Sequence, residues 1–166
     1  MIVTIWRHGT AEQGVKDDLR ELTMAGRDDV GFGCTQFHQA CEYRRIPLPT
    51  HLLHSPLLRT TQTAEIISTA FNHAAVNVEN ALQPGATVAA VDAVIAALSG
   101  QDSAEHIVLV SHQPLVSYVL DHYLGDAGSV PSLPPGGVAT LSLDVAAPGC
   151  GTLLFWAFPP EYEAGL

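Results

Sequence analysis

The chain has 166 residues, of which 47% are hydrophobic, and a formal net charge of -10. This length and composition suit a single domain with one core, spanning residues 1–166. With seven Lys and Arg against 17 Asp and Glu, the charge balance disfavours nucleic acid and anionic membrane surfaces as partners. No apolar stretch reaches the length of a membrane span and no signal peptide is visible, so we expect a cytoplasmic protein.

The first half of the chain alternates between strand-like and helix-like segments. A strand is expected at residues 2–6, followed by a helix that Thr23 caps and that runs through the low forties, although its glycines weaken it. A second strand at 52–54 precedes a helix from about 57 to 71, whose apolar residues recur at helical spacing. A short strand is expected at 76–78.

The second half continues this pattern and then changes. Thr87 caps the next expected helix, a solid apolar run at 107–110 predicts a central strand, and Pro114 suits the first turn of the helix that follows. Alternation of this kind predicts an α/β fold with an open, mostly parallel sheet and helices on both faces. The remaining segments are expected to be a surface loop at 125–137, an antiparallel strand pair or edge addition at 138–143 and 153–158, and a frayed tail at 159–166.

Cationic and imidazole side chains follow three of these expected strands. Arg7-His8-Gly9 ends the first, Ser55-Pro-Leu-Leu-Arg59-Thr-Thr-Gln-Thr-Ala64 follows the second, and Ser111-His112 ends the central one. In open α/β sheets, ligands bind beyond the carboxyl ends of the strands. The sequence therefore predicts that these groups converge on one crevice, where two arginines and two histidines make a site for a dianionic phosphoryl group.

Each group has a chemical role and a plainer alternative. A neutral His8 can attack phosphorus, and Gly9 lets the backbone turn and a ligand approach closely. Arg7 and Arg59 match phosphate oxygens with their planar forks, and His112 adds a second cation or donor. The alternatives are a structural histidine, a surface arginine paired with an acid such as Glu65, and an ordinary loop histidine.

Other candidates for metal or redox chemistry are weaker. The three cysteines, Cys34, Cys41 and Cys150, are odd in number and are expected to be buried free thiols rather than a disulfide framework or zinc site. His51 and His54 would point to opposite faces of a strand, so no metal site is predicted there. Four other histidines have no matching partners and are expected to be exposed: His38, His73, His106 and His122. Two acidic pairs are expected to be solvated charges: Asp17-Asp18 and Asp28-Asp29.

Together, Arg7-His8-Gly9, the segment from Ser55 to Ala64 and Ser111-His112 resemble the motifs of the histidine phosphatase superfamily, which has the phosphoglycerate mutase-like fold. The resemblance covers the chain from its start to about residue 124. Within that superfamily, the short length and Arg20-Glu-Leu22-Thr23-Met-Ala-Gly26 resemble the SixA type, the small bacterial phosphohistidine phosphatases.

This resemblance implies a mechanism. His8 would be the nucleophile that forms a phosphohistidine intermediate, which water then hydrolyses. Arg7, Arg59 and His112 would hold the phosphoryl oxygens, and Arg20 would assist them. No metal or cofactor is implied.

One departure from the superfamily pattern bears on the substrate. Many larger members carry a glutamate that protonates the leaving oxygen, whereas the corresponding stretch here contains Gln83; Glu12 is a substitute acid, with a solvated carboxylate as its plainer reading. The resemblance thus favours a P–N bond on a phosphohistidine-bearing protein, such as a phosphotransfer domain. A small-molecule phosphomonoesterase or mutase and a non-catalytic phosphate-binding adaptor remain the alternatives. No dimerisation stripe is visible, so we expect a monomer.

Overall fold

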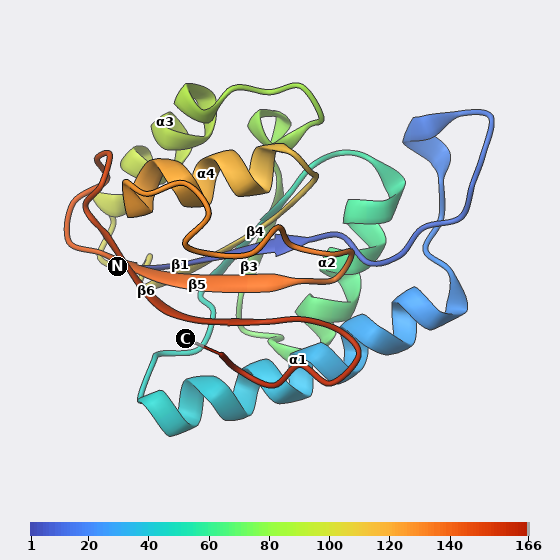
Figure 1. Ribbon diagram of the computed structural model, residues 1–166, viewed down its shortest axis with the longest axis horizontal. Coiled ribbons are helices and arrows are strands. Elements are labelled where there is room, and N and C mark those ends of the chain that lie inside the picture. Colours follow the sequence, from blue (N-terminus) through green and yellow to red (C-terminus); the bar gives the residue numbers. More distant parts are fainter. Residues whose placement is uncertain (166) are drawn as a thin grey trace.

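Six strands form one sheet, in the order β3-β2-β4-β1-β5-β6, in this computed structural model, which describes residues 1–165 (Figure 1). The strands are β1 (Ile2–Arg7), β2 (His51–His54), β3 (Ala75–Val78), β4 (His106–Ser111), β5 (Val138–Leu143) and β6 (Gly151–Ala157). Strands β1 to β4 are parallel to one another, whereas β5 is antiparallel to both β1 and β6. The α/β class, the mostly parallel open sheet and the C-terminal antiparallel pair are confirmed.

Two helices cover each face of the sheet (Figure 1). The helices are α1 (Met24–Arg44), α2 (Leu58–Ala70), α3 (Val88–Ser99) and α4 (Leu115–Leu124), with short 3-10 helices η1 (Asp17–Leu19) and η2 (Asn80–Leu82). Helices α1 and α2 pack on one face, and α3 and α4 pack on the other. Within residues 1–165, none of the helices combines the length and the apolar character that crossing a membrane requires.

The predicted helix caps form as the sequence indicates. The hydroxyl of Thr23 accepts a hydrogen bond from the amide of Gly26, and Thr87 caps α3 in the same way. The glycines that weaken α1 permit close approaches: a Cβ on Gly26 would lie 2.3 Å from the carbonyl oxygen of Thr10, and one on Gly33 would lie 2.6 Å from the ring of Tyr162. Gly26 thereby lets the segment after β1 pack directly on α1.

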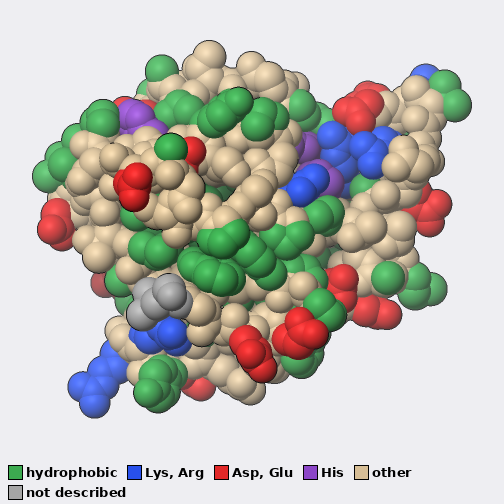
Figure 2. All heavy atoms as spheres, in the orientation of Figure 1, with side chains coloured by type: hydrophobic (Ala, Val, Ile, Leu, Met, Phe, Trp, Pro, Cys, Tyr) green, Lys and Arg blue, Asp and Glu red, His purple; other side chains and the backbone are tan. Residues whose placement is uncertain are grey.

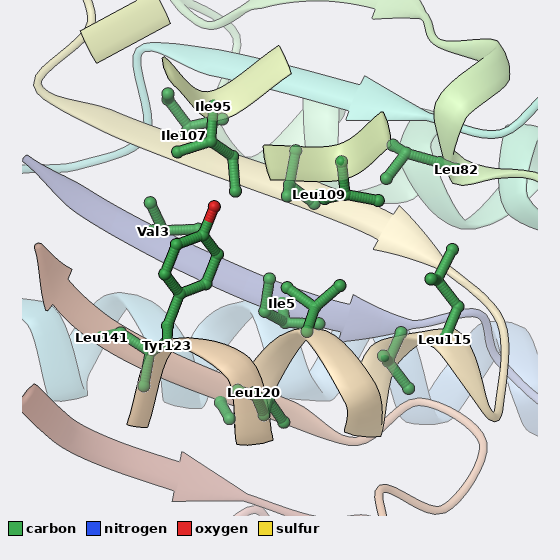
Figure 3. Packing of buried hydrophobic residues seen from close by; sticks show 14 of the residues in the cluster. Val3, Ile5, Leu82, Ile95, Ile107, Leu109, Leu115, Leu120, Tyr123 and Leu141 are labelled. Carbon is green, nitrogen blue, oxygen red and sulfur yellow. The ribbon is translucent and has the colours of Figure 1, made fainter. Parts of the chain in front are cut away.

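The core lies in two layers, one on each side of the sheet. Figure 3 shows the layer beneath α3 and α4, where Ile95 and Tyr123 from the helices meet Val3 and Ile107 from the strands. All six residues of β4 are buried, as expected for a central strand. Each fully buried side chain of this size contributes about 1.5–3 kcal/mol to folding, so these layers hold the strand ends in fixed positions.

His106 is fully buried, so the expectation that it is exposed is wrong. Both ring nitrogens find partners: Nε2 lies 2.8 Å from the hydroxyl of Thr4, and Nδ1 lies 2.6 Å from the carbonyl oxygen of Pro47. Because these contacts satisfy the ring, the cost of burying it is offset. By contrast, His73 is exposed, and His38 and His122 are half-buried.

The expected frayed tail is also wrong over residues 159–165; Leu166, its last residue, lies outside the described part. Tyr162 is only 2% exposed, and its hydroxyl donates a hydrogen bond of 2.9 Å to the carbonyl oxygen of Gly136. The loop at 125–137 is likewise not purely superficial, because Val130 and Leu133 join the core. The prediction missed these two residues because the many Pro, Gly and Ser residues around them are typical of a surface loop.

Two of the three cysteines are buried, as expected. Burial raises the pKa of the Cys34 and Cys41 thiols to about 12. Cys150 is exposed in the turn between β5 and β6, which corrects the expectation for that residue.

Candidate active site

The neighbouring strands β1 and β4 deliver two histidines to one place. Arg7 at the end of β1 pairs with Ser111 at the end of β4, and the amide of His8 donates a hydrogen bond of 3.1 Å to the carbonyl oxygen of Ser111. His8 and His112 therefore follow at the same edge of the sheet, and their ring centroids are 5.2 Å apart. The parallel register of two adjacent strands creates this pairing.

Arg59 reaches the same place from the first turn of α2, which follows β2. Its side chain is buried, and its Nε donates to Nε2 of His8 at 3.3 Å. Arg7 approaches from the other side, with one terminal nitrogen donating to the carbonyl oxygen of Leu133 at 3.0 Å. The Nε of Arg7 is buried and has no hydrogen-bond partner among the described residues.

These side chains border a pocket of about 380 Å³. Its lining residues are Arg7, His8, Thr10, Ala11, Gln13, Arg20, Arg59, Pro84, His112, Gln113 and Pro135. Figure 2 shows Lys or Arg side chains and His side chains gathered together on this face of the molecule. The structure thus brings together Arg7, His8, Arg20, Arg59 and His112, all of which the sequence singles out.

Gly9 lies beside this pocket rather than in its lining. Its amide donates to the hydroxyl of Thr63 at 3.1 Å, and a Cβ there would lie 2.9 Å from a methyl group of Val30. The absence of a side chain at Gly9 therefore allows close packing between the end of β1 and α1.

The hydrogen bonds of His8 identify its tautomer. Its Nδ1 lies 2.7 Å from the carbonyl oxygen of Gly9, which can only accept, so this nitrogen carries the hydrogen. Its Nε2, which accepts from Arg59, is unprotonated. Burial chiefly, together with the nearby charges of Arg59 and Arg7, lowers the pKa of His8 to about 4. At neutral pH the ring is uncharged, with a lone pair on Nε2.

His112 is bound to the protein through only one of its ring nitrogens. Its Nε2 lies 2.6 Å from the hydroxyl oxygen of Ser55, which in turn lies 2.7 Å from the hydroxyl of Thr60. Its Nδ1 is buried with no hydrogen-bond partner within residues 1–165. Burial, followed by the proximity of His8, lowers the pKa of His112 to about 3. A neutral ring of this kind can present one N–H group to a ligand.

Sequence reasoning missed two polar residues that support the site. Ser55 falls inside the motif that contains Arg59, yet its contact with His112 depends on the pairing of β2 with β4. Asp17 contacts both Arg20 and Arg59 at 3.2 Å, whereas the sequence indicates only solvated charge. The sequence offers one signal for such a pairing, which is the scarcity of Lys and Arg in an acidic chain. An acid close to one of these few arginines is a candidate partner for it.

Neither Glu12 nor Gln83, the two positions considered from the sequence for a general acid, borders the pocket. Glu12 contacts Arg20 through its backbone oxygen, and Gln83 lines a neighbouring hollow instead. In the part of the chain that the structure describes, the pocket lining contains no carboxylate. Among the same residues, no group of three or more His, Cys, Asp or Glu is placed to hold a metal ion.

Comparison with known proteins gives a consistent family assignment. No protein-family model and no curated protein matches the sequence. Among solved structures, the protein histidine phosphatase SixA complexed with tungstate is 27% identical, with a TM-score of 0.77 over 96% of this chain and 97% of that chain. A protein from Agrobacterium tumefaciens assigned as phosphohistidine phosphatase SixA is 23% identical, with a TM-score of 0.77 over 95% of this chain and 98% of that one.

A more distant neighbour shares the fold. The mycobacterial glucosyl-3-phosphoglycerate phosphatase complexed with VO3 is 17% identical, with a TM-score of 0.71 over 95% of this chain and 99% of that chain. In its fold and in the convergence of the Arg-His-Gly motif with Arg59 and His112, the chain is similar to solved members of the histidine phosphatase superfamily, among them a SixA phosphatase.

Proposed function

We propose that this chain is a phosphohistidine phosphatase that hydrolyses a P–N bond on a protein, with His8 as the nucleophile. The single observation that carries the proposal is the state of His8. Its Nδ1–H is fixed on Gly9, and its unprotonated Nε2 faces Arg59 in a pocket lined by cations. A neutral imidazole held in this way is a competent nucleophile toward phosphorus.

The surrounding groups match the charge of a phosphoryl group. Arg7 and Arg20 line the same pocket as His8, and Arg59 directs its Nε at His8. His112 contributes a donor when its hydrogen is on Nδ1, the tautomer in which Ser55 donates to Nε2. Phosphoryl transfer depends mainly on positioning and charge neutralisation, which these four side chains supply.

The reaction proceeds in two displacements. Nε2 of His8 forms a bond to phosphorus while the bond from phosphorus to the substrate imidazole breaks, and that imidazole leaves with the electron pair. Water then attacks the phosphohistidine, phosphate departs, and the electron pair of the broken P–N bond returns to Nε2 of His8. Each step exchanges one bond to phosphorus for another.

The leaving group explains the preference for P–N bonds. A phosphorylated imidazole that is protonated on its second nitrogen leaves as a neutral ring and needs no acid from the enzyme. An ester oxygen leaves as an alkoxide unless an acid protonates it. Because no carboxylate lines the pocket within residues 1–165, the site suits the first leaving group.

The test is to mix the chain with a phosphotransfer domain carrying labelled phosphohistidine, quench the reaction, and map the labelled residue. We expect acid-labile label on His8 and release of inorganic phosphate. The His8→Ala variant should show neither, and His73→Ala, which replaces an exposed histidine, should behave as the unaltered chain. Turnover by His8→Ala would overturn the proposal.

A substrate panel separates this function from its two alternatives. Phosphohistidine peptide and sugar phosphates are compared at matched concentrations. Preference for the sugar esters would identify a small-molecule phosphomonoesterase, and phosphate binding without turnover of either would identify a binding module.

A further inference from the structure

The guanidinium of Arg59 has two edges, and they contact different groups. One edge carries Nε, which donates to Nε2 of His8 at 3.3 Å. The other edge consists of the two terminal nitrogens, and both contact Asp17: one donates to its backbone oxygen at 2.7 Å, and the other to its carboxylate at 3.2 Å. A planar guanidinium held along one edge can present the other edge in only one direction.

Asp17 also contacts a second arginine. Its other carboxylate oxygen accepts a hydrogen bond of 3.2 Å from Arg20, whose Nε donates to the backbone oxygen of Glu12 at 2.7 Å. The hydrogen bond from Arg20, together with the charge of Arg59, lowers the pKa of Asp17. Asp17 therefore stays ionised and links two pocket arginines through η1.

The exposed side chain of Asp17 is unusual for a residue with so many contacts. It is 65% exposed, whereas the side chain of Arg59 is 6% exposed. Because water solvates the carboxylate of Asp17, it screens the attraction to Arg59 and limits what the pair contributes to the stability of the fold. Asp17 lies on the side of the Arg59 guanidinium that faces away from His8, where it can fix the orientation of that guanidinium.

We propose that Asp17 is a positioning residue that fixes the inner edge of Arg59 toward the phosphoryl group on His8. This inference rests on the proposed function, because it takes the phosphoryl group to be transferred at Nε2 of His8. The inner edge offers Nε–H and the second hydrogen of the adjacent terminal nitrogen, a fork that matches two phosphoryl oxygens. Asp17 holds that fork from behind without touching the substrate.

A carboxylate is required for this arrangement because it has two accepting oxygens. One oxygen accepts from Arg59 and the other from Arg20. An amide has a single oxygen, and its NH2 group would face one of the two guanidinium groups without accepting from it. Asp17→Asn therefore breaks the link while keeping the size of the side chain.

The test compares Asp17→Asn with Asp18→Asn. Asp18 is the adjacent acid and makes no ion pair or hydrogen bond within residues 1–165, so its substitution removes the same charge without the contact. We measure the affinity of each folded protein for vanadate, which mimics the transferring phosphoryl group, and for inorganic phosphate. Affinity for vanadate should fall about tenfold in Asp17→Asn and stay within about twofold in Asp18→Asn, as expected for loss of one oriented charge-assisted contact.

Repeating the Asp17→Asn substitution in a chain that already carries Arg59→Lys shows whether Asp17 acts by orienting the guanidinium of Arg59. Lysine at this position is a point charge with no second edge to hold. In Arg59→Lys, adding Asp17→Asn should change vanadate affinity by less than about twofold. An equal loss in both backgrounds, or equal behaviour of Asp17→Asn and Asp18→Asn, would refute the positioning role. Failure of the unaltered chain to bind vanadate or phosphate would instead refute the proposed function.

Discussion

The hydroxyl oxygen of Ser55 lies 2.6 Å from Nε2 of His112, at the edge where β2 and β4 run side by side. This contact holds the orientation of the His112 ring. Replacing Ser55 with Ala leaves both ring nitrogens of His112 without a protein partner. The variant is therefore expected to be destabilised by the free energy that it costs to leave a buried polar group without a hydrogen bond.

We expect Ser55→Ala to lower kcat about tenfold, since one misaligned donor to the phosphoryl oxygens costs about 1.4 kcal/mol. Steady-state kinetics on a phosphohistidine peptide check this. The matched control is Ser68→Ala, a half-buried serine in α2 whose hydroxyl donates a hydrogen bond to the backbone oxygen of Glu65, away from the pocket. An unchanged kcat in Ser55→Ala would show that the orientation of His112 does not depend on this contact.

His8, the proposed nucleophile, should remain uncharged well below neutral pH. The pKa of His8 is lowered to about 4, first by burial and then by the charges of Arg59 and Arg7. Nε2 thus keeps its lone pair as the pH falls through the ordinary histidine range, about 6.5. An NMR titration of the His8 ring in the free protein should give a midpoint below about 5, and a midpoint in the ordinary range would contradict the pocket electrostatics described here.

The buried His106 should make stability fall in mild acid. Its pKa is lowered to about 4 by burial, so the unfolded chain takes up a proton below about pH 6.5 while the folded chain does not. The neutral ring contributes stability that is present above the unfolded pKa and is lost as the pH falls toward the folded pKa. Between about pH 7.5 and pH 5 this amounts to about 2 kcal/mol.

Urea unfolding at several pH values measures this loss. His8 and His112 also have lowered pKa values. The free energy of unfolding of the unaltered chain should therefore depend on pH more strongly than one histidine alone would cause. His106→Gln should reduce the pH dependence by about 2 kcal/mol, whatever its stability at neutral pH. His73→Gln, at an exposed position, should keep the full dependence; an identical dependence in His106→Gln would be evidence against the assignment.

Tyr162 should stabilise the backbone next to His8. Its hydroxyl donates to the carbonyl oxygen of Gly136, whose amide donates to the carbonyl oxygen of His8 at 2.8 Å. Tyr162→Phe leaves a buried carbonyl unpaired, so the free energy of unfolding should fall by about 1–2 kcal/mol. Hydrogen exchange should also quicken at the Gly136 amide.

The comparison for this variant is Tyr43→Phe, which removes a hydroxyl from a side chain that is 86% exposed. It should match the unaltered chain in urea unfolding. If Tyr162→Phe were equally stable, the hydroxyl of Tyr162 would not be holding Gly136.

The main features of the fold and of the pocket could be predicted from local patterns. Apolar runs bounded by turn residues mark the strands, and Thr23 and Thr87 mark the starts of two helices. Since parallel strands share one carboxyl edge, residues that follow them must be neighbours. His8 and His112 could therefore be placed together without knowledge of any contact.

Contacts between side chains of irregular segments could not be predicted in this way. Asp17 belongs to a segment without periodicity, so its position over Arg59 depends on the path of the loop after β1. The burial of His106 depends on a hydroxyl that comes from another strand, Thr4. Tyr162 is buried because Gly33 leaves room for its ring. In each case the partner is distant in sequence and carries no pattern of its own.

The central place of β1 has a consequence for the order of assembly. This strand completes its pairing only with β4 and β5, both of which come from the second half of the chain. Contacts of such long sequence separation form late and slow the folding reaction. In a ribosome-bound or cleaved fragment that stops before β5, His8 would follow a strand with one side unpaired. We therefore expect phosphatase activity to appear only near the completion of synthesis.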